Sequence, residues 1–281
     1  MEIILKIFTY SLTFFILSNQ SMAQSIDSAY IKCSYKLTYI IDSTKPSFKQ
    51  TDIQNLLIGK KVSYYFSYLQ FQSDSMLKSD IDSHVITYEE LLKNPALKNK
   101  YSKRGLFLKN KLYINFPENK ITTLDKVALN DYYFEEEIEN LTWSILPDTM
   151  TVLNFLCQKA IINFHGRNYL AWFTNEIPIS SGPYKFHNLP GLILNISDTK
   201  GNYVYECIGV ERLLIKQPIL ISKNTYIKTT RNEFRKVLKN SFDNPYETLM
   251  SGSNFAISGP DADKFKAALQ KGLPYNPIEL E

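Results

Sequence analysis

Short runs of apolar residues, alternating with polar ones and separated by turn residues, dominate the chain from residue 30 to residue 212. Most of them are rich in Tyr, Phe, Ile, Val and Thr, which pack well on a pleated sheet. Hairpin turns between several runs favour antiparallel pairing. The runs that we expect to form strands are residues 30–41, 53–58, 61–69, 105–109, 111–116, 130–137, 141–146, 152–164, 169–177, 192–197 and 202–212.

The clearest hairpin surrounds the turn sequence His-Gly-Arg-Asn at residues 165–168. Glycine at the first central position of a two-residue turn is typical of type II′, so Gly166 is expected there. This turn would pair Phe164 with Tyr169 and would place the apolar side chains of both strands on one face. One buried face and one mixed face are what an antiparallel sheet requires.

A second hairpin is expected over residues 192–212, with its turn at Asp198-Thr-Lys-Gly201. A plain four-residue turn would pair Ile196 with Tyr203 and give a continuous apolar face. A type I turn with a glycine bulge would shift the partner by one residue and move the side chains to opposite faces. The local signals conflict, and both registers stay open.

Helical periodicity occurs in three places, at residues 87–101, 230–242 and 260–271. The first two begin with the pattern Thr-x-x-Glu, at Thr87 and Thr230. In this capping box the threonine hydroxyl and the glutamate each satisfy a backbone N–H of the first turn. The chain is therefore expected to combine a sheet with a few helices.

Residues 1–23 have the pattern of a signal peptide. Lys6 precedes an apolar run over residues 7–17, and the small residues Ser21 and Ala23 occupy the positions that a signal peptidase recognises. The run is shorter than the roughly 20 residues that a membrane-spanning helix needs. We expect cleavage after Ala23, export to the periplasm or the medium, and no membrane span in the mature chain.

The mature chain, residues 24–281, is long enough for one large domain. The net charge of +4, with both signs interspersed, argues against a nucleic-acid partner. Three cysteines remain, Cys33, Cys157 and Cys207. Export permits a disulfide between the last two, and separately buried thiols are the alternative.

Patterns that carry catalysis or bind metal are scarce. The three histidines, His84, His165 and His187, do not stand at metal-ligand spacing from one another or from a cysteine. There is no nucleophile elbow and no phosphate-binding loop. We therefore expect no metal and no cofactor. The charged residues that we expect to be solvated are Glu135–Glu137 and Glu139 at a strand edge, and Lys228, Arg231, Arg235, Lys236 and Lys239 on a helix.

The loop at residues 177–191 is long, stiffened by prolines, and too apolar for a linker. Loops of this length inside a domain are uncommon and are often functional. Its apolar side chains must be buried, so the loop either lines an apolar cavity or completes the core. These side chains are Ile177, Ile179, Tyr184, Phe186 and Leu189.

Around this loop, over about residues 155–210, the sequence resembles the GLPGLI family of exported Bacteroidetes proteins. The one departure from the name motif is Asn188, where the family has glycine. Asparagine is the next best residue for a positive φ, so this departure is mild. The matching residues are Cys157–Ala160, Gly166–Arg167, Ala171–Thr174, Ile177–Pro178, Gly182–Pro183, Phe186 and Leu189–Leu194.

The resemblance implies export and an antiparallel β-rich fold; the family has no established activity and no defined catalytic residues, so no catalytic role is carried over. The expected fold is one α+β domain with a mainly antiparallel, strongly curved sheet or incomplete β-barrel and a few helices. Such a fold is similar, by analogy, to periplasmic lipoprotein carriers of the LolA/LolB type. That comparison says little about function.

We therefore expect a non-catalytic envelope binding protein or chaperone for an apolar or lipidated ligand. A structural or assembly factor for an envelope complex is the alternative, and a hydrolase-type enzyme using Glu176, Lys185 or His187 is favoured less. The side chains that we expect to contact a ligand are Trp172, Phe173, Tyr184, Phe186 and Leu189, with polar contacts from Arg167 and Lys185.

Overall fold

Twelve strands form one continuous sheet in the part of the chain that the computed structural model describes, which comprises residues 23–82, 110–128, 130–221, 225–251 and 262–281. The strand order is β12-β6-β5-β4-β3-β2-β1-β11-β10-β9-β8-β7. The strands are β1 (Gln24–Ile40), β2 (Lys49–Gly59), β3 (Ser63–Ser67), β4 (Lys111–Ile114), β5 (Lys120–Val127), β6 (Asn130–Glu137), β7 (Ser144–Val152), β8 (Phe155–Phe164), β9 (Arg167–Thr174), β10 (Leu192–Asp198), β11 (Tyr203–Ile221) and β12 (Ile227–Lys228).

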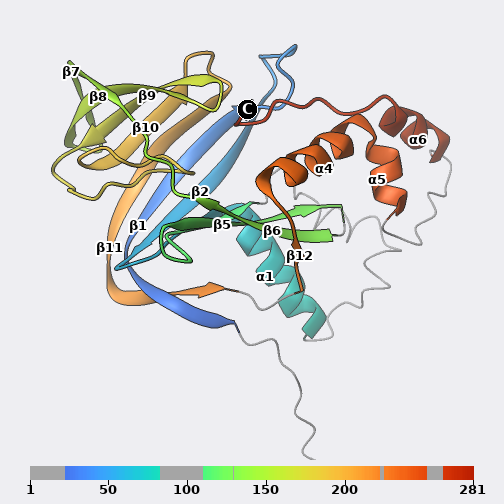
Figure 1. The fold of residues 1–281 in the computed structure, drawn as a ribbon, viewed down its shortest axis with the longest axis horizontal. Helices are drawn as coiled ribbons and strands as arrows, with labels where there is room; N and C mark the ends of the chain where they lie inside the picture. The colour runs from blue at the N-terminus through green and yellow to red at the C-terminus, as the bar shows by residue number, and fades with distance from the viewer. Residues whose placement is uncertain (1–22, 83–109, 129, 222–224, 252–261) are drawn as a thin grey trace, which may run out of the picture.

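The expected fold class is confirmed. All neighbouring strands pair antiparallel except β12 with β6, and the sheet is open because β7 and β12 form its two edges. The long strands β1 and β11 pair along their length and bend together, at the lower left of Figure 1. The sheet is therefore strongly curved, as expected.

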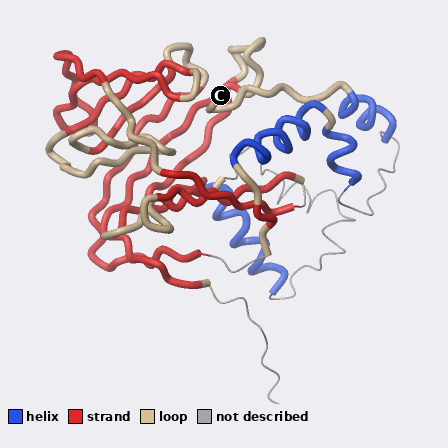
Figure 2. The backbone as a smooth tube through the Cα atoms, in the orientation of Figure 1, coloured by secondary structure: helices blue, strands red, loops and turns tan. Residues whose placement is uncertain are grey.

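Four helices accompany the sheet in the described residues: α1 (Tyr68–Asp82), α4 (Arg231–Asp243), α5 (Pro245–Ser251) and α6 (Ala262–Gln270). Figure 2 shows that α4, α5 and α6 gather at one side of the molecule. The expected helices at 230–242 and 260–271 correspond to α4 and α6. The expected helix at 87–101 and the strand at 105–109 lie outside the described residues. No helix among the described residues is long and apolar enough to cross a membrane.

The strand expected over residues 61–69 is too long, because the chain turns into α1 after β3. The hydroxyl Oγ of Ser67 accepts a hydrogen bond from the backbone N–H of Gln70 at 3.0 Å. Serine in this position satisfies one of the free N–H groups of the first helical turn. The helix therefore begins at Tyr68, where the aromatic pattern alone suggested a continuing strand.

The hairpin of β8 and β9 forms, but the expected register is wrong. The central residues of the turn are His165 and Gly166, with φ of 44° and 80°, so the turn is type I′ and pairs Phe164 with Arg167. Tyr169 consequently pairs with Ile162. The partner moves by two residues, so the side chains stay on the expected face.

The hairpin of β10 and β11 adopts neither of the two expected registers. Ile196 pairs with Tyr205, two residues beyond the partner that a plain four-residue turn would give. The carboxylate of Asp198 accepts a hydrogen bond from the backbone N–H of Tyr203 at 2.8 Å, and Gly201 adopts a φ of 68°. Because the shift is again even, the apolar side chains still share one buried face.

The loop at residues 177–191 completes the core of the sheet. The side chains of Tyr184, Phe186 and Leu189 are buried, and the ring of Phe186 lies 4.7 Å from that of Tyr169 between centroids. Asn188 has a φ of 68°, which confirms the conformation expected for this departure from the motif. The cysteines Cys33, Cys157 and Cys207 are free, buried thiols.

A buried carboxylate, Asp52 on β2, lies within this core. Its oxygens accept hydrogen bonds from the hydroxyl of Ser67 at 3.0 Å, the N–H of Ile53 at 2.7 Å and the amide of Gln54 at 2.7 Å. Burial raises the pKa of Asp52 to about 6, although these hydrogen bonds act in the opposite direction. The folded protein therefore binds a proton here more tightly than the unfolded chain does.

Replacing Asp52 with asparagine is expected to raise the free energy of unfolding at pH 7 by about 1–3 kcal/mol. The folded pKa of about 6 lies above the ordinary value of 3.8, so charging the group costs stability above pH 6, and this cost vanishes below about pH 4. The Gln54 amide now points its N–H at Asp52, and its buried oxygen Oε1 has no partner among the described residues; turning this amide over would let that oxygen accept from the new amide. Urea unfolding of both proteins from pH 4 to pH 8 measures the difference; a difference that does not shrink on acidification contradicts the assignment.

Candidate functional site

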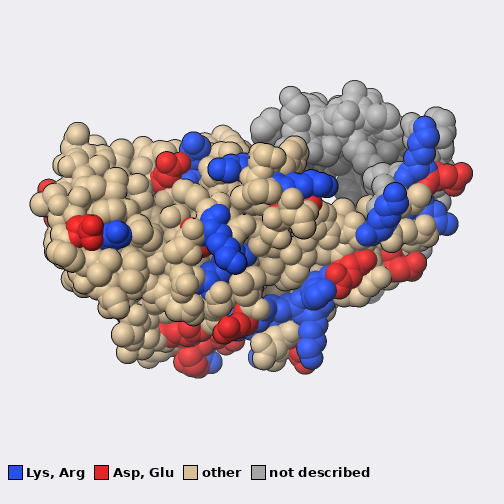
Figure 3. All heavy atoms as spheres, turned by 90° about the horizontal axis from the view of Figure 1, so that it is seen from above, with Lys and Arg blue, Asp and Glu red and all other residues tan. Residues whose placement is uncertain are grey.

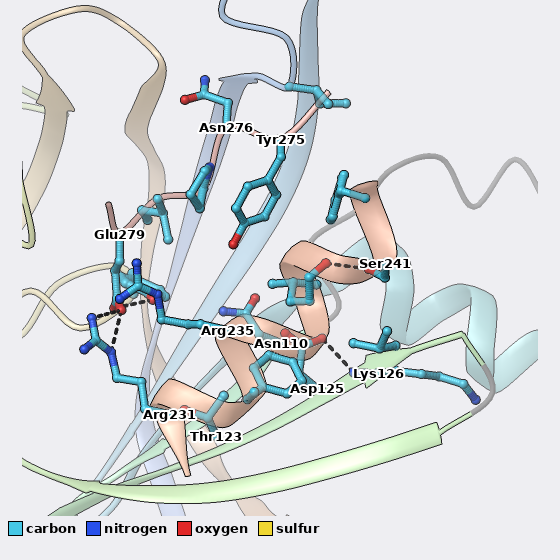
Figure 4. A pocket seen from close by; sticks show the side chains of 18 of the residues that line it. Asn110, Thr123, Asp125, Lys126, Arg231, Arg235, Ser241, Tyr275, Asn276 and Glu279 are labelled. Carbon is cyan, nitrogen blue, oxygen red and sulfur yellow. Dashed lines mark hydrogen bonds and ion pairs between the residues drawn. The ribbon is translucent and has the colours of Figure 1, made fainter. Parts of the chain in front are cut away.

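A pocket of about 540 Å³ opens between α4, the end of β5 and the C-terminal tail, which we define as residues 272–281. α4 and the tail form two walls and β5 lies below them, as Figure 4 shows. Aromatic and aliphatic side chains provide much of the surface. They include Phe134, Phe234, Leu238, Phe242, Tyr275 and Ile278.

The position of α4 is fixed at its first turn. Thr230 and Glu233 form the capping box expected from the sequence. One turn later the buried ring of Phe234 packs on Tyr132 and Phe134 of β6, with centroid distances of 5.6 Å and 5.4 Å. Capping and this aromatic contact together hold the helix across the end of the sheet, so that its next turns form the pocket wall.

Two buried polar atoms without a partner among the described residues belong to residues that line the pocket. They are the hydroxyl oxygen of Thr123 on β5 and the side-chain oxygen of Asn110. Buried polar atoms are nearly always hydrogen-bonded, so an unpaired one beside a cavity is informative. Arg235 of α4 also lines the pocket and makes no ion pair with any described residue.

An ion-pair cluster lies at the inner end of the pocket. The carboxylate of Glu279 accepts from the Lys185 ammonium at 2.8 Å, from the Arg231 guanidinium at 2.7 Å, and from the hydroxyl of Tyr184 at 2.6 Å. Lys185 also pairs with Glu136 of β6. The cluster thus joins the tail, α4, the loop and the sheet, and Figure 4 shows the tail and α4 meeting at Glu279 and Arg231.

The electrostatics of the cluster favour its ionised form. Burial by itself would raise the pKa of Glu279, but Lys185 and Arg231 outweigh burial and hold this pKa at about 2. Tyr184 reaches the carboxylate from a backbone with a φ of 58°, a conformation that is rare for an aromatic residue. The main chain is strained at this point in order to present the hydroxyl.

Arg167, the first residue of β9, also holds the tail. Its guanidinium donates to the carbonyl oxygen of Pro277 at 2.6 Å and to the side chain of Asn276 at 2.6 Å, and lies 3.3 Å from the carboxylate of Asp198. The tail continues past the β8–β9 turn, where the N–H of Leu280 donates to the carbonyl of His165 at 2.8 Å. This hairpin end therefore serves as a binding surface for the tail.

The structure divides the residues expected to contact a ligand. Tyr184 and Lys185 line the pocket, whereas Arg167 binds the tail beside it. The other four do not line the pocket. Phe173, Phe186 and Leu189 lie in the core. Trp172 is half-buried, and the Lys159 ammonium lies 5.9 Å from the centroid of its ring.

For two charged side chains, Glu136 and Arg231, the expectation that they are solvated is wrong. Glu136 lies on the inner face of β6, where Lys185 meets it, while its neighbours Glu135 and Glu137 both lie near Lys120. Arg231 turns from α4 into the ion-pair cluster. Strand alternation explains Glu136, but the loop that brings Lys185 to it is remote in sequence.

The side chains considered for catalysis are engaged in structural contacts. The ring nitrogens of His187 lie 2.7 Å and 2.9 Å from the carbonyl oxygens of Lys185 and Glu139. Glu176 accepts from the backbone N–H of Leu156 at 2.8 Å. His84 lies outside the described residues. Within the described part of the chain, no group of three His, Cys, Asp or Glu residues could hold a metal ion.

Reasoning from the sequence missed the pocket, because its walls come from α4 and the tail. The helical spacing of Phe234, Leu238 and Phe242 indicated an apolar face but not what it covers. The tail sequence around Tyr275 and Glu279 has no regular period. On the face of the molecule seen in Figure 3, basic and acidic side chains are interspersed, so bulk charge gave no pointer either.

Comparisons with known proteins bear on the hairpin and the loop. Residues 164–195 match the family model described as a protein of unknown function (Porph_ging). Two solved structures of PNGF-II, in space groups P21 and C2, are similar at 12% and 13% identity, each with a TM-score of 0.48. They cover 77% and 75% of this chain but 34% and 33% of their own, so this chain spans about a third of their length. No curated protein sequence matches the chain.

Proposed function

We propose that this chain is a non-catalytic binding protein, and that its ligand is an apolar molecule with an acidic head group. The observation that carries the proposal is the pocket of about 540 Å³ between α4, β5 and the tail. Binding sites for small molecules are concave, mostly apolar and between roughly 300 and 1,000 Å³ in volume. A single acyl chain or a molecule of similar size would fill it.

The charges around the pocket support an acidic head group. Four residues of the lining are cationic, and two, Asp125 and Glu279, are acidic. Arg231 and Lys185 are committed to Glu279, but Arg235 has no ion pair. A carboxylate or phosphate beside Arg235 would supply the missing partner. The cations are Lys126, Lys185, Arg231 and Arg235.

The location that we propose is the cell envelope. It rests on the signal-peptide pattern with cleavage after Ala23, which would send the mature chain to the periplasm or the medium. The resemblance to the GLPGLI family of Bacteroidetes supports the same location. A ligand with an acyl chain would be abundant there.

Filling the pocket is expected to weaken ligand binding at least tenfold. Ser241 lines the pocket from α4, and Ser241→Trp would occupy a large share of its volume. The matched control is Lys236→Trp, on the exposed side of the same helix. Fluorescence titration with cis-parinaric acid measures the affinity, and its methyl ester tests the head group. Equal affinity in the two tryptophan variants, or no binding to the unaltered protein, contradicts the proposal.

The second candidate is an assembly factor, and the edge strand β7 favours it. Ile145 and Met150 are exposed on this open edge, where another chain could add a strand. Pro147 and Asp148 lie between them and are residues that limit such pairing. Native mass spectrometry of the protein from its own envelope distinguishes the two candidates, because a retained lipid supports the first and a retained protein supports the second.

A further inference from the structure

A large bulge interrupts the pairing of the two longest strands. Ile31 of β1 pairs with Arg212 of β11 and Ala29 pairs with Gln217, so four residues of β11 lie opposite the single residue Tyr30. We call these four residues, Leu-Leu-Ile-Lys at 213–216, the β11 bulge. It lies in the middle of the long β11 strand, which bends at the lower left of Figure 1.

The bulge exposes two adjacent aliphatic side chains almost completely. Leu214 is 99% exposed and Ile215 is 88% exposed, the highest fractions among the large apolar residues of the described chain. Leu213 turns the other way and packs against a buried cluster that includes Val62 and Ile219. The bulge is thus anchored at its base. Single exposed apolar residues are common, but an anchored, protruding pair is not explained by folding.

Basic residues adjoin this pair along the chain and also lie two strands away, across β1. Arg212 and Lys216 flank it in the chain, and Lys60 and Lys61 follow Gly59, which pairs with Ala29 on the other side of β1. None of the four makes an ion pair with a described residue.

Two acidic groups lie nearby, and only one of them, Glu211, has a cation outside these four as its partner. The carboxylate of Asp27 accepts hydrogen bonds from the backbone N–H groups of Lys61 and Val62, at 2.7 Å and 2.9 Å. Glu211 lies 3.5 Å from Lys32. The bend therefore carries more positive than negative charge, because the Asp27 carboxylate offsets only part of the charge of the four cations.

We propose that the β11 bulge and these four cations dock the protein on a membrane surface that carries anionic phospholipid. Side chains such as Leu214 and Ile215 enter the boundary between head groups and acyl chains, while Lys and Arg beside them remain at the level of the phosphates. A protruding tip with a cationic surround fits a fluid, negatively charged surface. The proposal is independent of the pocket and its ligand.

Co-sedimentation with vesicles tests it. The chain that the proposed cleavage leaves, residues 24–281, is mixed with vesicles of phosphatidylglycerol and phosphatidylethanolamine, and in parallel with vesicles of phosphatidylcholine alone. Binding is expected on the anionic vesicles and is expected to fall with salt. The double variant Leu214→Ser with Ile215→Ser should lose at least about tenfold in partitioning, and Lys216→Gln about fivefold.

The matched control is Leu156→Ser, since Leu156 is 61% exposed on β8. It should bind vesicles as the unaltered chain does, and all variants should keep the same thermal midpoint. Unchanged partitioning of the double variant, or equal binding to neutral vesicles, overturns the proposal. If the chain does not bind vesicles but self-associates through the bulge, a second copy of the chain is the occupant and the membrane assignment is wrong.

Discussion

Replacing Glu279 with glutamine is expected to lower the free energy of unfolding at pH 7 by about 3–5 kcal/mol. The carboxylate is buried and lies within 3 Å of the charged groups of both Lys185 and Arg231. Glutamine keeps the shape but removes the charge, and Glu136 alone would then face the buried Lys185 and the partly buried Arg231. Removing one partner of a buried ion pair is costly because the remaining charge stays desolvated. Urea unfolding at neutral pH measures the loss.

The matched control is Glu211→Gln. Its carboxylate also lies near a lysine, Lys32 at 3.5 Å, but the Glu211 side chain is 62% exposed, so solvent screens the pair. An exposed pair of this kind contributes at most about 1 kcal/mol. Similar losses in the two variants would mean that the buried cluster does not hold the tail.

Acidification gives a second measurement on the same variant. The pKa of Glu279 is about 2 in the folded protein, below its ordinary 4.5, so its stabilising contribution is complete above about pH 4.5 and is lost as the pH falls toward 2. The difference between the unaltered protein and Glu279→Gln should therefore shrink over that interval. A difference that stays constant down to pH 2.5 would show that the carboxylate is not preferentially ionised.

Local pattern was sufficient for most of the sheet and for α4. Alternation of apolar residues indicated the strands around Tyr169 and Tyr205, and the capping box at Thr230 marked the first turn of α4. The positive φ of Asn188 also followed from residue type alone. The partner of each hairpin moved by two residues from the register of the type II′ turn in the first and of the plain four-residue turn in the second, so these registers give the correct buried faces. The glycine-bulge register, which had stayed open for the second hairpin, would have given the wrong ones.

The pocket could not be predicted in this way, because long-range contacts create it. Arg167 meets Pro277, and Lys185 meets Glu279, over about 100 residues of intervening sequence. A charged residue in a strand or loop looks the same in sequence whether water or a distant carboxylate is its partner. The same limit explains why Glu136 was expected in solvent. The loop at residues 177–191 was expected either to line an apolar cavity or to complete the core; Phe186 and Leu189 are in the core, and Tyr184 lines the pocket.

Gly191→Ala is expected to be the other strongly destabilising change, lowering the free energy of unfolding by about 3 kcal/mol. A Cβ at this position would lie 1.9 Å from the carbonyl oxygen of Thr174 and 2.6 Å from its carbon. Both atoms belong to the backbone at the end of β9, where Leu192 pairs with Thr174, so no side-chain rotation relieves the overlap. The strands must separate, and a buried core resists such a shift. Thermal or urea unfolding of the variant measures the loss.

Two other glycines make the prediction a graded series. A Cβ at Gly182 would lie 2.9 Å from Cβ and Cδ1 of Ile193 and 3.0 Å from the carbonyl oxygen of Phe186, a much smaller overlap, so Gly182→Ala should cost less. At Gly209, on β11, a Cβ would meet nothing within 4 Å, and Gly209→Ala should be neutral or slightly stabilising because it restricts only the unfolded chain. The loss of stability is expected to grow as the distance from the new Cβ to the nearest atom becomes shorter, whether or not the glycine belongs to the loop at residues 177–191. A Gly191→Ala protein as stable as the Gly209→Ala protein would show that β9 and β10 do not approach as closely as the structure has them.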